Sequence, residues 1–339
     1  MDGAQLTCIG WGVVKVQTNE PVSVGASGSA RQNVPLTTAA LAGSPHRLRK
    51  ENLISKLMYG AALVSVVVSG LIMYALFSEA WVFMRDVDWA QTWGQIGWFP
   101  RRGIYDMPTL LIASFWTTLI AMVVAAPLGL GAAIYLSEYA RSSHRALFKP
   151  ILEVLAGIPS VVFGFFALLW LAPNVVANIG GAGGRGSMVA AGLGVGILTI
   201  PLVASISEDA MAAVPKSLRE ASAGLGARKA VTTLRVVLPA AVSGLVASMI
   251  VAVSRALGET MVVFMAGGAA DAAVRTITPY DGSLTMPAAM ASLASGTDQV
   301  VGEGLTFQSL FFVGLVLFLL TLGLNLIGDR FVARIREQY

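Results

Sequence analysis

The sequence predicts an all-α membrane protein whose chain crosses the bilayer six times. Hydrophobic residues make up 55% of the 339 residues and charged residues only 12%, and the mean hydropathy is +0.72. These values are typical of a polytopic membrane protein and not of a soluble domain of this length. Six apolar segments are long enough to span a bilayer. Arginine and lysine gather in alternate connecting segments, which predicts that both termini lie in the cytoplasm.

Residue counts alone disfavour several classes of function. The single cysteine, Cys8, excludes an internal disulfide framework and a four-cysteine metal site. With two histidines and no cluster of carboxylates in the apolar segments, the chain offers neither a nucleophile and base nor the metal ligands of a membrane-embedded enzyme. The net charge of +4 is small, and no segment resembles a nucleic-acid surface. We therefore expect no catalytic residue, no metal and no nucleic-acid partner.

Residues 1–50 are expected to form a flexible cytoplasmic tail. They are rich in Gly, Ser, Thr and Asn and show no helical or strand period. The apolar runs near Cys8 to Val16 are short and interrupted by Lys15, so we expect no cleaved signal peptide. A transmembrane domain, residues 51–339, follows, and its first span is expected at Leu57–Ser78, whose 22 residues carry no charge.

The second span is expected at Pro108–Ser137, with a kink or an early break near Pro127. The segment before it, residues 79–107, carries four tryptophans, which indicate an interfacial segment on the outer surface or a loop whose aromatic side chains cover helix ends. In chain order the remaining spans are expected at Ile151–Ala172, Met188–Ile206, Ala240 to about Met265, and about Leu305 to Gly328.

The segments that join these spans divide into two kinds. Residues 138–150 are basic and are therefore expected in the cytoplasm, whereas residues 174–187 and 266–304 carry little positive charge and are expected to be external loops. The second of these external loops, together with the tryptophan-bearing segment, is the expected contact surface for an external partner. Its alternative is a simple re-entrant or surface loop.

A polar and basic insert, Ser207–Pro239, separates the fourth and fifth spans. Pro215 suits a first helical turn, Ser217 and Glu220 stand at capping-box spacing, and Gly226 permits a left-handed stop. A second helix is expected at Arg228–Leu238, ended by Pro239. A short helix with an apolar face, a fixed turn and basic flanks, held between two spans, is suited to docking on another protein.

This insert resembles the EAA loop of the permeases of ABC importers. Its pattern is Glu-Ala-Ala, three residues, Gly, nine residues and Ile-x-Leu-Pro. Here the matching residues are Glu220, Ala221, Gly226, Leu238 and Pro239, while Ser222 replaces the second Ala and Val236 replaces the Ile. The resemblance covers about residues 55–337. It implies the fold of a type I importer permease and a loop that inserts into a cleft of a cytoplasmic ATPase and passes its closure to the membrane spans.

Two further segments resemble the phosphate-specific importers. They are Ser254–Val263, with the sequence SRALGETMVV, and Leu152–Leu168. The Met after Glu-Thr favours a PstC-type subunit over a PstA-type one. The resemblance then implies three partners: a second permease (PstA-type), a dimer of the ATPase (PstB-type) and an external phosphate-binding protein (PstS-type). The chain has no phosphate loop of the Gly-x-x-x-x-Gly-Lys-Ser/Thr kind, so ATP is expected on the ATPase partner.

Arg255 and Glu259 are the candidate residues of the substrate path. They form the only charged pair in the middle of a predicted span, one helical turn apart and therefore on one face. A charge at bilayer depth is expected to face a water-filled path or a partner. Either the two side chains form a mutual ion pair that holds helices together, or Arg255 donates to phosphate oxygens and Glu259 accepts the remaining P–OH proton.

Two alternatives to a phosphate importer stay open. An ABC importer for another oxyanion, sulfate or molybdate, would share the insert and most of the spans. A secondary transporter or channel would share the composition, but it has no need of a docking loop with this spacing.

Overall fold

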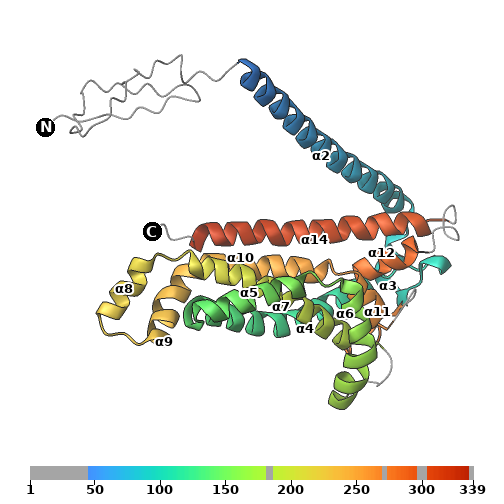
Figure 1. Ribbon diagram of the computed structural model, residues 1–339. Coiled ribbons are helices and arrows are strands. Elements are labelled where there is room, and N and C mark those ends of the chain that lie inside the picture. Colours follow the sequence, from blue (N-terminus) through green and yellow to red (C-terminus); the bar gives the residue numbers. More distant parts are fainter. Residues whose placement is uncertain (1–44, 181–185, 269–272, 296–303, 336–339) are drawn as a thin grey trace, which may run out of the picture. The chain divides into compact units, whose positions relative to one another are not determined.

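The computed structural model describes residues 45–180, 186–268, 273–295 and 304–335. The expected tail lies outside the described residues as far as residue 44. The chain divides into two compact units, Met1–Val64 and Ser65–Tyr339. Within the described ranges, six helical stretches are long and apolar enough to cross a membrane (Figure 1). The predicted fold class and number of spans are therefore confirmed.

Helix α2 (Pro45–Asp86) is longer than the span predicted inside it. In the first unit its apolar side chains, among them Leu57 and Leu63, are exposed, as expected for contact with lipid. In the second unit its last turns are fixed by packing, because the buried ring of Phe83 lies 5.1 Å from Tyr105 and 4.9 Å from Phe312, measured between ring centroids. This burial extends the helix into the segment expected to be a loop.

The centre of the second unit is the pair of helices α4 (Met107–Ile134) and α7 (Met188–Ala212). Small residues let the two helices approach closely: a Cβ atom on Gly129 would lie 2.6 Å from the Cβ atom of Val203, and one on Gly192 would lie 2.8 Å from that of Ile120. Helix α7 begins at the predicted residue, where the Ser187 hydroxyl accepts from the Ala190 N–H at 3.1 Å.

Of the kink or early break expected near Pro127, the early break is wrong. Helix α4 continues through Pro127 to Ile134 and then widens into the π-helix η2 (Tyr135–Tyr139). Packing of Gly129 against α7 lies just beyond the proline, so tertiary contacts maintain the helix where local preference disfavours it.

The third span differs most from its prediction. Helix α5 (Ser142–Ala156) occupies most of the expected basic loop and the expected start of the span. The chain is interrupted at residues 157–159 and resumes as α6 (Ser160–Phe166), the π-helix η3 (Ala167–Val176) and the short helix η4 (Ala177–Ile179). Pro159 lacks an N–H and disfavours the helical conformation of the residue before it, so a new helix begins after it.

The fifth span is interrupted in a similar way. The short helix α9 (Lys229–Thr232), the π-helix η5 (Thr233–Val237) and α10 (Leu238–Leu257) form one continuous stretch. A break at residues 258–260 precedes α11 (Met261–Ala266). Helices α6 and α11 pack on each other, and a Cβ atom on Gly164 would lie 2.9 Å from the sulfur of Met265. The two interrupted spans therefore lie side by side beyond their breaks.

The segments expected to be external contain short, partly buried elements. They are α3 (Trp89–Gly94), η1 (Pro100–Arg102) and two strands, β1 (Gly97–Trp98) and β2 (Ala273–Val274), which pair antiparallel. Trp81, Trp89 and Trp93 are exposed, whereas Trp98 is fully buried, so of the two expected arrangements Trp98 fits the one in which aromatic side chains cover helix ends. The centroid of its ring lies 5.9 Å from that of Tyr105, in an edge-on arrangement.

Helix α12 (Met286–Ala294) lies within the predicted external loop 266–304 and is largely buried against α14 (Thr306–Ile335) and α11. The loop is therefore not a simple surface connection. Its residues 269–272 and 296–303 lie outside the described ranges, as do residues 181–185 of the predicted loop 174–187.

Candidate functional site

The predicted insert is shorter in the structure than in the sequence. Helix α7 continues to Ala212, and the fifth span begins as a helix at Lys229, so only residues 213–228 lie between them. Pro239 does not end a helix. It stands in the first turn of α10, directly after η5, where the wider π-turn accommodates the missing N–H. Leu238 packs in a small apolar cluster with Met211, Val214 and Val237.

Helix α8 (Lys216–Gly224) carries the Glu-Ala-Ser segment and ends in a Schellman motif. Gly226 has a left-handed backbone, with φ of +77°, as predicted. Its N–H donates to the Ala223 carbonyl at 2.9 Å, and the Ala227 N–H donates to the Ser222 carbonyl at 3.2 Å. The predicted capping box is wrong, because the helix begins after Pro215 with no side-chain cap.

The residues of α8 differ in what they contact. Glu220, Ala221 and Gly226 are exposed, and the side chain of Leu225 is 90% exposed at the tip of the turn. Leu218, in contrast, packs against the apolar cluster around Met211. The helix is therefore anchored through Leu218 while the EAA residues stay exposed, which is the arrangement that a docking helix requires.

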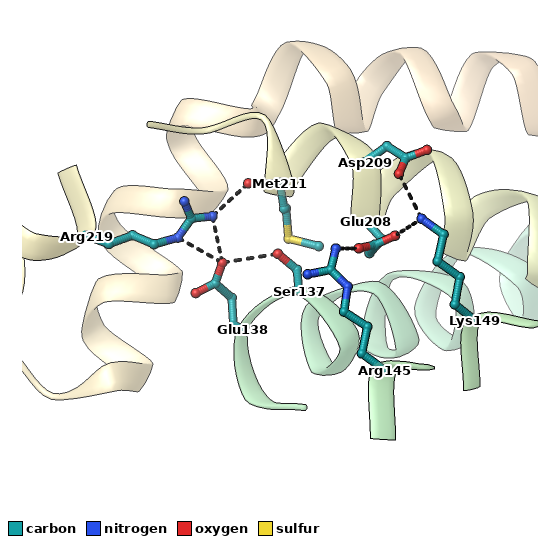
Figure 2. A network of polar contacts seen from close by, with 8 residues as sticks. All are labelled: Ser137, Glu138, Arg145, Lys149, Glu208, Asp209, Met211 and Arg219. Atoms are coloured by element: carbon teal, nitrogen blue, oxygen red, sulfur yellow. Dashed lines mark hydrogen bonds and ion pairs between the residues drawn. The ribbon is translucent and has the colours of Figure 1, made fainter. Parts of the chain in front are cut away.

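Arg219 extends from α8 and joins three elements (Figure 2). Its guanidinium donates to Glu138 Oε1 at 2.9 and 3.3 Å. It also donates to the backbone carbonyls of Met211 at 2.7 Å and Val214 at 2.6 Å. Glu138 lies in η2, and its side chain is only 6% exposed. Carbonyls at the end of a helix carry partial negative charge. The guanidinium therefore binds the Glu138 carboxylate and the negative end of α7 at the same time.

A second network ties α5 to α7. The Glu208 carboxylate is buried, and it accepts from Lys149 at 3.0 Å and forms an ion pair with Arg145 (Figure 2). Lys149 also donates to Asp209 at 3.4 Å. The hydrogen bond to Glu208 raises the pKa of Lys149 and so further favours its charged form. Burial of one carboxylate between two cations fixes α5 against α7.

The structure does not place Arg255 and Glu259 on one face of one helix. Arg255 lies in the last turn of α10, whereas Glu259 lies in the break before α11. Glu259 Oε1 accepts from the N–H groups of Met261 at 3.1 Å and Val262 at 3.4 Å. It therefore caps α11 and does not pair with Arg255. Among the described residues, the exposed Arg255 has no hydrogen-bond or ion-pair partner.

A further buried charged pair, like the two networks above, was not predicted from the sequence. Asp106, which is fully buried, accepts from Arg275 Nε at 2.9 Å and forms an ion pair with the same guanidinium, which also donates to the Trp93 carbonyl at 3.1 Å. The pair joins the start of α4 to the segment after β2. No local pattern marks these two residues, because 169 positions separate them in the sequence.

The chain matches a family model described as "Binding-protein-dependent transport system inner membrane component" over residues 125–337. It is 35% identical over 205 residues to the "Probable ABC transporter permease protein YqgH" of Bacillus subtilis, a match that covers 60% of this chain and 63% of that relative. It is 30% identical over 280 residues to the "Phosphate transport system permease protein PstC" of Mesorhizobium japonicum, covering 77% of this chain and 83% of the relative.

A solved structure shows the same fold. The chain resembles a protein of "a bacterial ABC transporter involved in the import of the acidic polysaccharide alginate" with a TM-score of 0.57 and 13% sequence identity. The likeness covers 86% of this chain and all of that one, 100%. At this identity the likeness supports the arrangement of the helices alone.

Proposed function

Because this chain belongs to the family of binding-protein-dependent transport system inner membrane components, we propose that it forms the path for inorganic phosphate in an ATP-driven importer. It is a multi-pass membrane protein and a permease of the ABC importer class. The bacterial cytoplasmic membrane, with both termini inside, is the location that its family and its basic segments support.

Three kinds of partner belong to this proposal. A cytoplasmic ATPase dimer (PstB-type) binds ATP and docks on α8. A second permease (PstA-type) completes the path, and an external phosphate-binding protein (PstS-type) delivers the substrate. The family description names a binding-protein-dependent system, and relatives that match most of this chain are named as phosphate transport permeases.

The observation that carries the docking role is that α8 is anchored while its EAA residues stay exposed. Glu220, Ala221 and Gly226 are exposed at the positions that keep the EAA spacing, while Leu218 and Arg219 fix the helix from behind. Leu238 and Pro239 lie outside the exposed turn, at the start of α10. We assign them to the support of the loop and not to contact with the ATPase.

The path role rests on the break in the fifth span. Arg255 is exposed and free of partners among the described residues, and Glu259 uses only Oε1 in capping α11. Oε2 has no hydrogen bond within the described part of the chain. An arginine that donates to phosphate oxygens, four residues before a carboxylate that accepts a P–OH proton, favours hydrogen phosphate over fully ionised sulfate.

Transport in a reconstituted system tests this proposal. Proteoliposomes with this chain, the second permease, the ATPase and the binding protein are expected to accumulate radiolabelled phosphate when ATP is supplied. A tenfold excess of unlabelled phosphate should compete with the label, and the same excess of sulfate or molybdate should not. ATP turnover without phosphate uptake, together with uptake of labelled sulfate or molybdate, would assign the chain to another oxyanion.

A further inference from the structure

We infer that Arg219 is the positioning residue that passes movement of α8 to α4 and α7. The inference rests on the proposed function, in which α8 docks the ATPase. It concerns how a docked helix is connected to the membrane spans. Exposed positions of the EAA loop can contact a partner, but they cannot by themselves move a span.

The backbone of α8 has few direct contacts with the central helices. It packs on α9 and η5, which belong to the fifth span. Between α8 and the ends of α4 and α7 lies a hollow of about 450 Å³, lined by residues that include Glu138, Arg145, Lys216 and Lys229. Movement of α8 therefore reaches the fifth span through backbone packing. It reaches the ends of α4 and α7 through the apolar contact of Leu218 with the cluster around Met211 and, across the hollow, through polar side chains.

Arg219 crosses this space. Its guanidinium lines the hollow and binds Glu138 on η2 and the carbonyls of Met211 and Val214 at the end of α7. Four donated hydrogen bonds hold it there, and its side chain is 23% exposed while that of Glu138 is 6% exposed. A planar guanidinium that is bound on several sides has little freedom to turn, so a shift of α8 displaces both helix ends together.

Glu138 is well placed to distribute the displacement. It lies in η2, the π-helical continuation of α4, and α4 packs on α7 along its length. The carbonyls of Met211 and Val214 belong to the last turn of α7 and the residues just after it. The same turns of α7 carry Glu208, which holds α5, so three elements meet beside the one arginine (Figure 2).

The test compares Arg219→Met with Lys216→Met in the reconstituted complex. Methionine keeps the length of either side chain and removes its charge. Lys216 is an exposed residue of the same helix that lines the same hollow and forms no ion pair among the described residues. Two quantities are measured: the ATPase that co-purifies with the chain, and the radiolabelled phosphate taken up per ATP hydrolysed.

Arg219→Met is expected to bind the ATPase as well as Lys216→Met does, while its uptake per ATP falls by about fivefold. Equal uptake per ATP in the two variants would overturn the inference. Loss of the ATPase from Arg219→Met would also overturn it, since Arg219 would then be a docking residue. If the unmodified complex takes up no phosphate, the proposed function fails. If it takes up phosphate and the two variants do not differ, the inference about Arg219 fails and the proposed function stands.

Glu138→Gln provides a second test that does not depend on the fold of the arginine variant. It keeps the shape of the side chain and weakens the ion pair, so uptake per ATP should fall, though less than in Arg219→Met, because the two α7 carbonyls remain bound. The double variant should couple no worse than Arg219→Met alone, because both changes remove one connection. An additive loss would show that the two residues act separately and would contradict the inference.

Discussion

Ser222 and Thr232 share a buried hydrogen bond, with 2.8 Å between their hydroxyl oxygens, that joins α8 to α9 across the turn at Gly226. Ser222 is the position at which this chain departs from the Glu-Ala-Ala pattern. The departure has a structural reason, because an alanine there would leave Thr232 without this partner. The hydroxyl pair fixes the angle between the docking helix and the start of the fifth span.

Removing the Ser222 hydroxyl and removing the Thr232 hydroxyl should destabilise the loop by different amounts. Ser222→Ala leaves Thr232 its second, weaker bond to the Arg228 carbonyl at 3.5 Å, so opening of the loop should become easier by only about 0.5 to 1 kcal/mol. Thr232→Val leaves the buried Ser222 hydroxyl unpaired and should cost about 1 to 3 kcal/mol. The rate of tryptic cleavage at Arg228 and Lys229 under native conditions measures both. A larger effect of Ser222→Ala would contradict this account.

Gly226→Val should lower ATPase co-purification and phosphate uptake while the protein still inserts. A Cβ atom on Gly226 would meet nothing within 4 Å, so the expected cost of about 1 to 2 kcal/mol comes from the left-handed backbone and not from a clash. Gly224→Ala is the matched control. Its Cβ would also meet nothing, and its φ is not positive, so it should dock normally. Full ATPase binding by Gly226→Val would make the docking assignment wrong.

What could be predicted from the sequence depended on local rules. The start of α7 follows from Ser187 as a helix cap, and the turn at Gly226 follows from the tolerance of glycine for a positive φ. Each requires only neighbouring residues. The spacing of the EAA residues belongs to the same class, because it is a pattern within one loop.

What could not be predicted depended on distant contacts. The length of α4 beyond Pro127 is maintained by packing on α7, and the roles of Arg219, Glu208 and Asp106 require partners from other helices. The break at residues 258–260 was not predicted for a different reason. The segment is apolar enough to read as one span, and only the capping of α11 shows where that span divides.

Cysteine labelling tests the proposed orientation. Ile277→Cys, at a position 73% exposed in the predicted external loop, should react with an impermeant maleimide from outside intact cells. Leu225→Cys, at a position 90% exposed on the docking turn, should react only after permeabilisation. Cys8 is first replaced by serine, and Ser283→Cys provides a buried control, because Ser283 is only 2% exposed. Labelling of Leu225→Cys from outside, without labelling of Ile277→Cys, would show that the orientation is the opposite of the proposed one.

Exchange of the two charges in the fifth span would not separate a structural role from a transport role. The exchange Arg255→Glu with Glu259→Arg would be informative only for two residues that pair on one helical face. The structure shows that Glu259 accepts two backbone N–H groups at the start of α11. An arginine at this position cannot accept them, so the exchanged protein should lose both the cap and any path function.

Glu259→Gln separates the two roles. The amide oxygen of glutamine can accept from the Met261 and Val262 N–H groups as Oε1 does now, so α11 should begin at the same residue. The second carboxylate oxygen, however, becomes an NH₂ group, which donates where a P–OH proton needs an acceptor. If Glu259 lines the path, phosphate uptake should fall by at least about tenfold, because hydrogen bonds to charged groups contribute about 1.5 to 3 kcal/mol, while the ATPase still co-purifies. Glu259→Ala is the control that removes cap and acceptor together, and it should lower thermal stability as well as uptake. Full uptake by Glu259→Gln, with loss only in Glu259→Ala, would leave Glu259 as a helix cap and would exclude it from the path.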